Sequence, residues 1–311
     1  MSDKIATREA YGTALAELGE KYKNIVVMDA DLSKSTYTCK FLEKFPDRFF
    51  NMGIAEANMA ATAAGLASCN KIPFISTFAV FASGRAFDQI RNSIAYPELN
   101  VKIGATHAGI TVGEDGGSHQ SIEDIALMRS IPGMTVICPA DGIETKAAVE
   151  ASILHKGPVY LRLGRVAVPF VNKDTSDYKF EIGKAVKLAD GNDVTIIATG
   201  LMVQEALEAR ELLYKDGISA GVINMHTIKP IDEQAIIDAA TSTGRIVTAE
   251  EHSIIGGLSE AVAGVTSRYC PVPVAMVGIR DVFGRSGKPG ELMKYYGLTS
   301  LDIVQSVKSI I

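Results

Sequence analysis

Residues 101–121 read VKIGATHAGITVGEDGGSHQS. The run begins with a short apolar segment and continues into a glycine-rich loop that carries two histidines and two acids. A short, continuous apolar run is typical of a strand buried on both faces, as in a parallel sheet covered by helices. Ligands bind beyond the carboxyl ends of such strands, so the loop is predicted to lie at a functional site.

The same pattern recurs on both sides of this segment. Short apolar runs alternate with stretches of helical periodicity, which favours a doubly wound α/β domain. The predicted strands are 24–29, 73–77, 101–106, 134–138 and 159–163, and the clearest predicted helices are 55–68 and 142–155.

A polar stretch at 170–183, FVNKDTSDYKFEIG, then interrupts the alternation. It resumes with predicted strands at 193–200, 218–225, 245–251 and 272–279, which are separated by predicted helices. The expected fold is therefore α/β with two domains, each a mainly parallel doubly wound sheet. The boundaries that we predict are 1–169 for the first domain, 170–185 for a linker and 186–311 for a smaller second domain.

Composition narrows the function classes. The chain has 311 residues, 47% of them hydrophobic, which is enough for two folded domains. Its net charge of −5 is spread without long runs of one sign, which disfavours nucleic-acid and anionic-membrane partners. No apolar run approaches the ~20 residues of a membrane-spanning helix, and the first residues lack a signal peptide's apolar segment. We therefore expect a cytoplasmic protein.

The glycine-rich loop holds the densest group of reactive side chains. His107, Glu114, Asp115 and His119 lie within 13 residues. Two histidines and two carboxylates could in principle bind zinc or iron, but the HxH or HxxxH spacing of such sites is missing. We therefore predict no metal ligands in this chain, and a solvated loop with incidental histidines remains an alternative.

Two further segments carry candidate residues. Glu56 opens a predicted helix made mostly of Ala and Met; it either complements the helix dipole or exchanges a proton from an apolar pocket. Phe78 and Phe81 end a predicted strand and begin a helix, where they either pack in the core or stack on a flat heterocycle. Polar residues at other element ends complete the candidates: Arg8, Asp31, Ser35 and Arg165.

Taken in order and spacing, six segments resemble the pyrimidine-binding and C-terminal domains of transketolase, a thiamine diphosphate enzyme. They are ATREAYGTAL (6–15), DADLSKST (29–36), NMGIAEANM (51–59), STFAVF (76–81), THAGITVGEDGGSHQSIED (106–124) and LGRVAVP (163–169). The resemblance covers essentially the whole chain. Transketolases also carry an N-terminal domain whose GDG motif and downstream Asn hold Mg²⁺ and the diphosphate, and no segment here matches it. The resemblance thus implies a split transketolase in which a separate N-terminal subunit supplies that site.

The resemblance also implies residue roles at the cofactor. Glu56 matches the glutamate that hydrogen-bonds a ring nitrogen of the aminopyrimidine and holds the proton that activates the cofactor. Phe78 and Phe81 match aromatics that pack on the pyrimidine, while the family's third aromatic aligns with Gly84. Asp31 matches an acid close to the cofactor at the subunit interface.

At the sugar, His107 and His119 match histidines that contact its oxygens, and Asp115 matches an acid that reads hydroxyl stereochemistry. Arg8, Ser35 and Arg165 match the group that binds the phosphate. Two guanidinium groups and a hydroxyl suit a phosphate, because charge-assisted and bidentate hydrogen bonds are strong.

The activity that the resemblance implies is transfer of a two-carbon ketol unit from a ketose phosphate to an aldose phosphate, as in the pentose phosphate pathway. The expected assembly is a heterotetramer with two copies of each subunit. Three alternatives stay open: a ketol transferase for another sugar, a 2-oxo-acid dehydrogenase beta-type subunit, and a binding subunit without catalysis.

Overall fold

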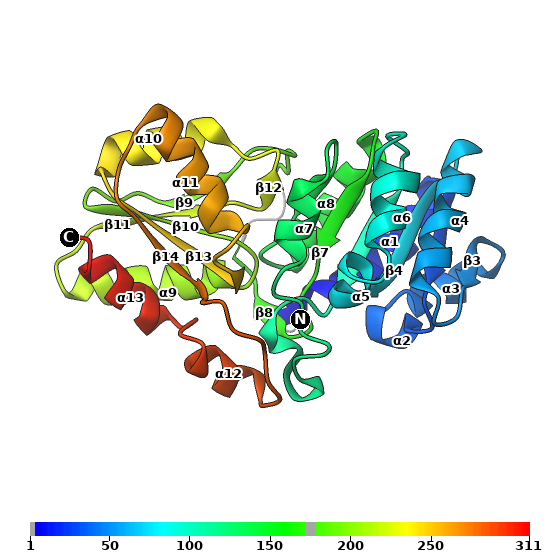
Figure 1. Ribbon diagram of the computed structural model, residues 1–311, viewed down its shortest axis with the longest axis horizontal. Helices are drawn as coiled ribbons and strands as arrows, with labels where there is room; N and C mark the ends of the chain where they lie inside the picture. The colour runs from blue at the N-terminus through cyan, green and yellow to red at the C-terminus, as the bar shows by residue number, and fades with distance from the viewer. Residues whose placement is uncertain (1–3, 172–177) are drawn as a thin grey trace.

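The computed structural model describes residues 4–171 and 178–311, and it contains two parallel-dominated sheets side by side (Figure 1). The first has seven strands in the order β12-β6-β7-β5-β4-β2-β3. Their bounds are β2 Ile25–Asp29, β3 Phe49–Asn51, β4 Ile72–Phe78, β5 Lys102–Thr106, β6 Thr135–Ile137, β7 Val159–Arg162 and β12 Thr227–Lys229. The five strand runs predicted in the first part of the chain coincide with β2, β4, β5, β6 and β7.

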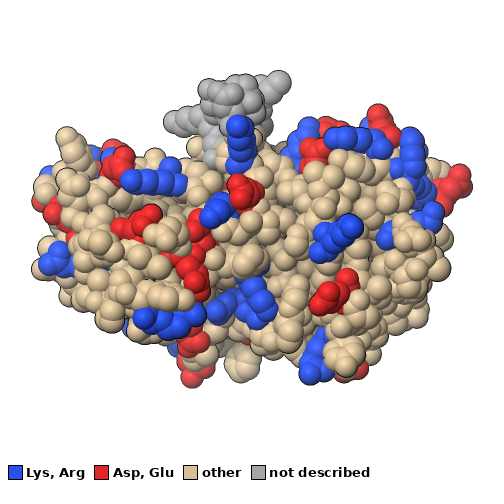
Figure 2. All heavy atoms as spheres, turned by 90° about the horizontal axis from the view of Figure 1, so that it is seen from above, with Lys and Arg blue, Asp and Glu red and all other residues tan. Residues whose placement is uncertain are grey.

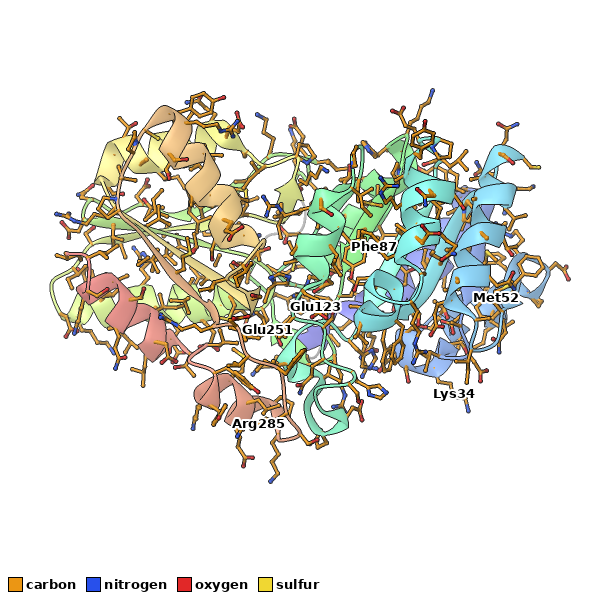
Figure 3. The ribbon with its side chains drawn as sticks, viewed as in Figure 1. Lys34, Met52, Phe87, Glu123, Glu251 and Arg285 are labelled. Atoms are coloured by element: carbon orange, nitrogen blue, oxygen red, sulfur yellow. The ribbon has the colours of Figure 1, made fainter. Side chains whose placement is uncertain are left out.

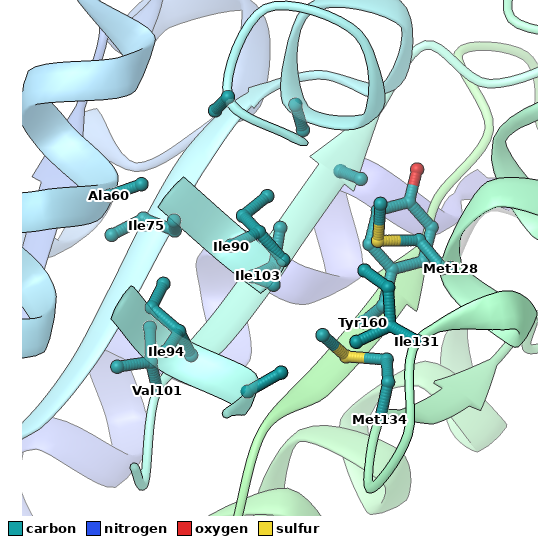
Figure 4. Close-up of a cluster of buried hydrophobic side chains, with 14 of the residues drawn as sticks. Ala60, Ile75, Ile90, Ile94, Val101, Ile103, Met128, Ile131, Met134 and Tyr160 are labelled. Carbon is teal, nitrogen blue, oxygen red and sulfur yellow. The ribbon is translucent and has the colours of Figure 1, made fainter. Parts of the chain in front are cut away.

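Helices cover both faces of this sheet, as a doubly wound fold requires. One face packs against α1 (Thr7–Lys21) and α8 (Gly142–Leu154), and the other against α4 (Glu56–Ser68), α7 (Asp124–Ser130) and the π-helix η2 (Ile90–Ala95). Figure 4 shows part of the core on the latter face of this sheet, where Ile75 and Ile103 of the strands meet Ile90 and Ile94. Shorter elements complete this half: β1 Lys4–Ala6, α2 Ser33–Thr36, α3 Cys39–Lys44, η1 Pro46–Arg48, α5 Ala79–Ser83, α6 Phe87–Gln89, η3 Ile110–Asp115 and β8 Ala167–Pro169.

The second sheet has five strands in the order β14-β13-β10-β11-β9. Its helices again lie on both faces, α9 and α13 on one and α10 and α11 on the other. The bounds are β9 Val186–Ala189, β10 Val194–Ala198, α9 Met202–Lys215, β11 Ala220–Asn224, α10 Glu233–Thr243, β13 Ile246–Ser253, α11 Leu258–Tyr269, β14 Val274–Ile279, α12 Pro289–Tyr295 and α13 Ser300–Lys308. The α/β fold class predicted from the sequence is confirmed.

The two halves share structure in a way that the sequence did not indicate. Strand β12 comes from the second half of the chain but pairs antiparallel with β6 of the first sheet. Ile228 of β12 is buried in the first core, and Ile110 and Ile122 of the first half are buried in the second. The proposed linker 170–185 includes residues 172–177, which lie outside the described part, so these boundaries stay a prediction.

Charge is distributed as the composition indicates. Figure 2 shows Lys and Arg interspersed with Asp and Glu on the face that it draws, without one continuous field of a single sign. Among residues 4–171 and 178–311, the structure contains no helix long and apolar enough to cross a membrane.

Candidate active site

The candidate site lies at the carboxyl ends of β4 and β5, the central strands of the first sheet. These strands pair in parallel, with Phe78 opposite Thr106. His107 follows Thr106 directly, so the register places it beside Phe78. The two rings stack, with centroids 3.8 Å apart and planes inclined by 23°.

Phe81 and Arg85 extend this stack. The Phe81 ring lies 5.7 Å from that of Phe78, and the two planes are within 7° of parallel. Above Phe81, the Arg85 guanidinium carbon lies 4.0 Å from the ring centroid, in cation–π geometry. Phe78 is buried whereas Phe81 is partly exposed, so Phe81 is the aromatic that an incoming flat ring could reach.

Glu56 is the first residue of α4, and its side chain is only 6% exposed. The helix that follows consists mainly of small residues and packs closely on the sheet through buried Met59, Ala60 and Ala63. The Glu56 Oε1 atom accepts a hydrogen bond from Arg85 Nη1 at 2.9 Å. Arg85 therefore joins the buried carboxylate to the aromatic stack.

Gly84 stands where the family pattern would place a third aromatic. A Cβ atom added there would lie 2.7 Å from the Val80 carbonyl oxygen, which is too close for any side chain without a shift of the backbone. Here the neighbouring Arg85 lies over Phe81. Arg85 is thus a site residue that the sequence reasoning missed; its position four residues after Phe81, one helical turn away, was the available signal.

His107 is buried and adopts a left-handed backbone with φ 56°, an uncommon conformation outside glycine. Its Nδ1 lies 2.9 Å from Thr106 Oγ1 and its Nε2 lies 3.3 Å from Arg8 Nη1. Because a guanidinium can only donate, Nε2 accepts and the ring is neutral. Burial, together with the charges of Arg8 and Arg165, lowers the pKa of His107 to about 3.

The rest of the glycine-rich loop brings His119 to the same place. The His119 ring meets Phe81 edge-on at 5.4 Å and Phe78 at 6.2 Å, and its Nδ1 lies 3.0 Å from Ser118 Oγ. Asp115 ends η3 and is exposed. The structure therefore gathers both histidines around one phenylalanine pair.

The polar residues predicted to bind a phosphate also converge. Arg8, in the first turn of α1, donates from Nη1 to the Ser35 main-chain oxygen at 2.7 Å and from Nε to the Arg165 oxygen at 3.2 Å. Arg165 Nη1 donates to the Val112 carbonyl oxygen and lies 3.2 Å from Glu114 Oε2. Arg8 thus joins this group to His107, at the edge of the aromatic cluster.

Asp31 lies apart from that cluster. It follows β2, which in the sheet order is separated from β5 by β4, and it is exposed with φ 64°. Its carboxylate accepts a hydrogen bond from Asn51 Nδ2 at 2.9 Å, at the end of the edge strand β3.

Two family models cover most of the chain. The model described as transketolase, pyrimidine binding domain matches residues 3–170, and the transketolase C-terminal domain model matches residues 183–303. The chain belongs to the transketolase family. A transketolase C-terminal section from Methanocaldococcus jannaschii is 55% identical over 96% of this chain and 94% of that protein.

Other transketolase relatives show how the chain relates to longer proteins. It is 46% identical to the 6-deoxy-6-sulfo-D-fructose transketolase subunit SqwH of a Clostridium species, over 97% of this chain and 94% of that one. Rat transketolase is 41% identical over the whole chain, which spans 50% of the rat protein. A solved structure described as "Split gene transketolase, inactive beta4 tetramer" matches with a TM-score of 0.92 and 55% identity, covering 98% of each chain. The chain thus corresponds to the C-terminal section of a split transketolase.

The residues present fit one part of the transketolase cofactor. A buried carboxylate at the start of α4 suits a ring nitrogen, and the partly exposed Phe81 ring, over which Arg85 lies, suits a flat pyrimidine in place of that guanidinium. Within the described residues, no group of three or more His, Cys, Asp or Glu is placed to hold a metal ion. The fit therefore extends to the aminopyrimidine and not to Mg²⁺ with the diphosphate.

Proposed function

We propose that this chain is the catalytic C-terminal subunit of a two-chain, cytoplasmic transketolase that moves a two-carbon ketol unit from a ketose phosphate to an aldose phosphate. The observation that carries the proposal is the joining of three groups on one sheet edge. Buried Glu56 is linked to the Phe78–Phe81 pair through Arg85, the two histidines contact that pair directly, and His107 also contacts Arg8 of the Arg8–Arg165 pair. A binding subunit without catalysis would not require all three.

Glu56 and the aromatic pair would hold the aminopyrimidine of thiamine diphosphate. When bound, the cofactor supplies the carbanion chemistry of ketol transfer. Glu56 would bond the pyrimidine ring nitrogen and hold the proton there, while Phe81 would pack on the ring. Arg85, which now pairs with Glu56, is 54% exposed and is free to move toward solvent when the pyrimidine takes its place.

The histidines and the acid would bind the sugar. His107 is neutral, so it can both donate and accept hydrogen bonds to hydroxyl and carbonyl oxygens without bringing a charge. His119 faces the same aromatic pair, and Asp115 extends from the same loop toward solvent. In this arrangement Asp115 would read hydroxyl stereochemistry at the mouth of the site.

Arg8, Ser35 and Arg165 would bind the terminal phosphate. Both arginines now donate to main-chain oxygens or to exposed Glu114. A dianion would compete well with these neutral and solvent-screened partners, because charge-assisted bonds are roughly twice as strong as neutral ones. Binding energy gained there orients the reacting carbon.

The remaining part of the site would come from other chains. An N-terminal subunit would supply Mg²⁺ and the diphosphate contacts, and Asp31 at the exposed end of β2 would face the subunit interface. We propose a heterotetramer with two copies of each subunit, since symmetric closure is the common outcome for such assemblies.

A second substrate class is supported by one comparison. The Clostridium relative is named for a sulfonated ketose, and a sulfonate presents the same three oxygens to two arginines as a phosphate does. The terminal anion can therefore be a phosphate or a sulfonate.

The test is reconstitution with an N-terminal transketolase subunit, thiamine diphosphate and Mg²⁺, followed by a ketol-transfer assay. A ketose phosphate, 6-deoxy-6-sulfo-D-fructose and a 2-oxo acid serve as competing donors. We expect turnover in the mixture with the ketose phosphate and none with this chain alone. Preference for the sulfonated donor would show that the substrate is a sulfonated ketose. Preference for the 2-oxo acid would assign the chain to another enzyme class. No turnover with any donor would indicate a binding subunit without catalysis.

A further inference from the structure

The loop at residues 107–121 is held by the second half of the chain. Ile110 and Ile122, which flank its glycine-rich part, are buried in the second core with Leu292 and Met293 of α12. In Figure 1 the blue-green loop around η3 lies beside α12, and Figure 3 places Arg285 there and Glu251 where the two halves meet. The sugar-binding loop thus has a scaffold outside its own sheet.

Gln120, next to His119, makes the central contact of this scaffold. Its side chain is buried, and Nε2 donates toward three carbonyl oxygens, those of Ile110 at 3.1 Å, Gly113 at 3.2 Å and Arg285 at 2.9 Å. Two of these oxygens belong to the loop itself and the third to the second half. One amide group therefore fixes the loop's internal shape and its position on its support.

The backbone of the loop also lies so close to residues 284–286 that no side chain fits between them at Gly116 or Gly117. A Cβ atom at Gly117 would lie 2.6 Å from the Gly284 carbonyl oxygen, and one at Gly116 would lie 2.5 Å from Ser286 Oγ. Gly116 in addition has φ 78°, which favours glycine. The glycines therefore allow the backbone contact that Gln120 bridges.

A second anchor holds the beginning of the loop. Glu251 of β13 accepts a hydrogen bond from the Thr111 main-chain N–H at 2.7 Å. The Glu251 carbonyl oxygen in turn accepts from Arg162 Nη2 at 2.9 Å, and Arg162 pairs with buried Asp124. Both ends of the segment that carries Asp115 are thus tied to the second half.

We propose that Gln120 is a positioning residue for substrate binding, through which residues 284–286 of the second half fix the loop that carries Asp115 and His119. The inference rests on the proposed function for the substrate itself. The second half would thus affect substrate binding although none of its own residues contacts the substrate. Loss of the Gln120 bonds would release His119 from the aromatic pair while leaving Glu56, on another element, in place.

The first test measures the loop itself, in the full-length chain. Gln120→Met keeps the volume of the side chain and removes its hydrogen bonds, and Gln204→Met is the matched control. Gln204 also donates across the two halves, to the Pro169 carbonyl oxygen. We expect amide hydrogen exchange in residues 107–121 to rise about tenfold in Gln120→Met, the equivalent of one hydrogen bond, and to stay at the wild-type rate in the control.

The second test measures catalysis in the reconstituted complex. Gln120→Met should raise the KM for the ketose donor about tenfold, while exchange of the thiazolium carbon proton, which depends on Glu56, stays at the wild-type rate. Gly117→Ala should give the same pattern from the other side of the contact. Gly290→Ala is its control, because a Cβ there meets no atom within 4 Å.

The outcomes separate the proposals. Wild-type exchange rates in residues 107–121 of Gln120→Met would overturn the positioning role. An equal loss of donor binding and of thiazolium proton exchange would also overturn it, since that pattern shows a general loss of folding. A wild-type complex without ketol transfer overturns the proposed function alone, because hydrogen exchange still decides whether Gln120 fixes the loop.

Discussion

The two halves of the chain have the same doubly wound architecture but use the carboxyl ends of their central strands differently. In the first half, β4 ends in Phe78, which contacts partly exposed Phe81 and His119, and His107 follows the end of β5. In the second half, β13 carries Glu250, Glu251 and His252, all of them buried. The same strand position thus leads to partly exposed side chains in one half and to buried ones in the other.

The hydrogen bonds of the second half explain this difference. Glu250 accepts bonds from the main-chain N–H groups of Leu258 and Ser259 at 2.7 and 2.8 Å, so it caps the N-terminus of α11. Glu251 accepts a hydrogen bond from the main-chain N–H of Thr111 in the loop at residues 107–121. The comparison teaches that fold alone does not place the chemistry. A buried carboxylate whose oxygens bond the main chain supports structure, whereas Glu56, among the described residues, bonds only an exposed arginine side chain that can move away.

The largest expected effect is on proton exchange at the cofactor, which should depend on Glu56 and not on Glu250. Glu56→Gln keeps size and a hydrogen bond but removes the exchangeable acid proton, so exchange of the thiazolium carbon proton should slow by about 10²- to 10⁴-fold in the complex. Quenched NMR of the bound cofactor measures the rate. A thermal melt of the same variant should remain near wild type.

Glu250→Gln is the matched control from the other half. It should lower stability, because one of the capping acceptors becomes an amide, and it should leave proton exchange per folded molecule unchanged. Equal exchange rates in Glu56→Gln and wild type would remove Glu56 from the mechanism and leave it a helix-dipole role worth ~0.3 to 1 kcal/mol.

A smaller effect is expected for Arg8 and Arg165, the two arginines proposed to bind the terminal anion. Arg8→Ala and Arg165→Ala should each raise the KM for phosphorylated sugars by about 10- to 150-fold, the worth of one charge-assisted bond, roughly 1.5 to 3 kcal/mol. Unphosphorylated acceptors should change little. Steady-state kinetics with both substrate types measures the ratio.

Arg129→Ala is the control for this pair. Arg129 donates to the Gly257 carbonyl oxygen at 2.8 Å and so joins the two halves without reaching the site. Its replacement should affect both substrate types alike. The same uniform loss in Arg8→Ala or Arg165→Ala would show that the arginine is structural.

The last comparison concerns pH, where the effect on stability has opposite signs in the two halves. Because the pKa of His107 is lowered to about 3, its contribution to stability is full above pH ~6.5 and is lost as the pH falls. Relative to His107→Asn, wild type should lose about 2 kcal/mol of unfolding free energy between pH 7 and pH 5. Chemical denaturation at the two pH values measures the difference.

Glu251 provides the contrast. Burial raises its pKa to about 7, so its contribution is full below pH ~4.3 and is lost as the pH rises through 7. Relative to Glu251→Gln, wild type should therefore become less stable between pH 5 and pH 7. A shift of the same sign for both residues would contradict the environments that the structure assigns to them.

The sequence predicted the parts of the molecule that follow from local pattern. Buried strands showed as apolar runs, and the rule for strand carboxyl ends placed the loop with His107 and His119 at one edge. It did not predict β12, because three residues that pair antiparallel with a distant strand leave no periodic signal. Gln120 was missed because its contact to Arg285 joins segments far apart in the chain. The contact of Arg85 to Glu56 is distant as well, although its spacing from Phe81 was a local signal. The roles of the site residues stay predictions.

Isothermal titration calorimetry of thiamine diphosphate and Mg²⁺ tests most directly whether the site is shared between two chains. The titration is made into this chain alone and into its mixture with the N-terminal subunit. We expect no tight binding to the chain alone, because its described residues offer the diphosphate no metal site, and micromolar or tighter binding to the mixture. Micromolar binding with ketol transfer by this chain alone would contradict the two-chain site.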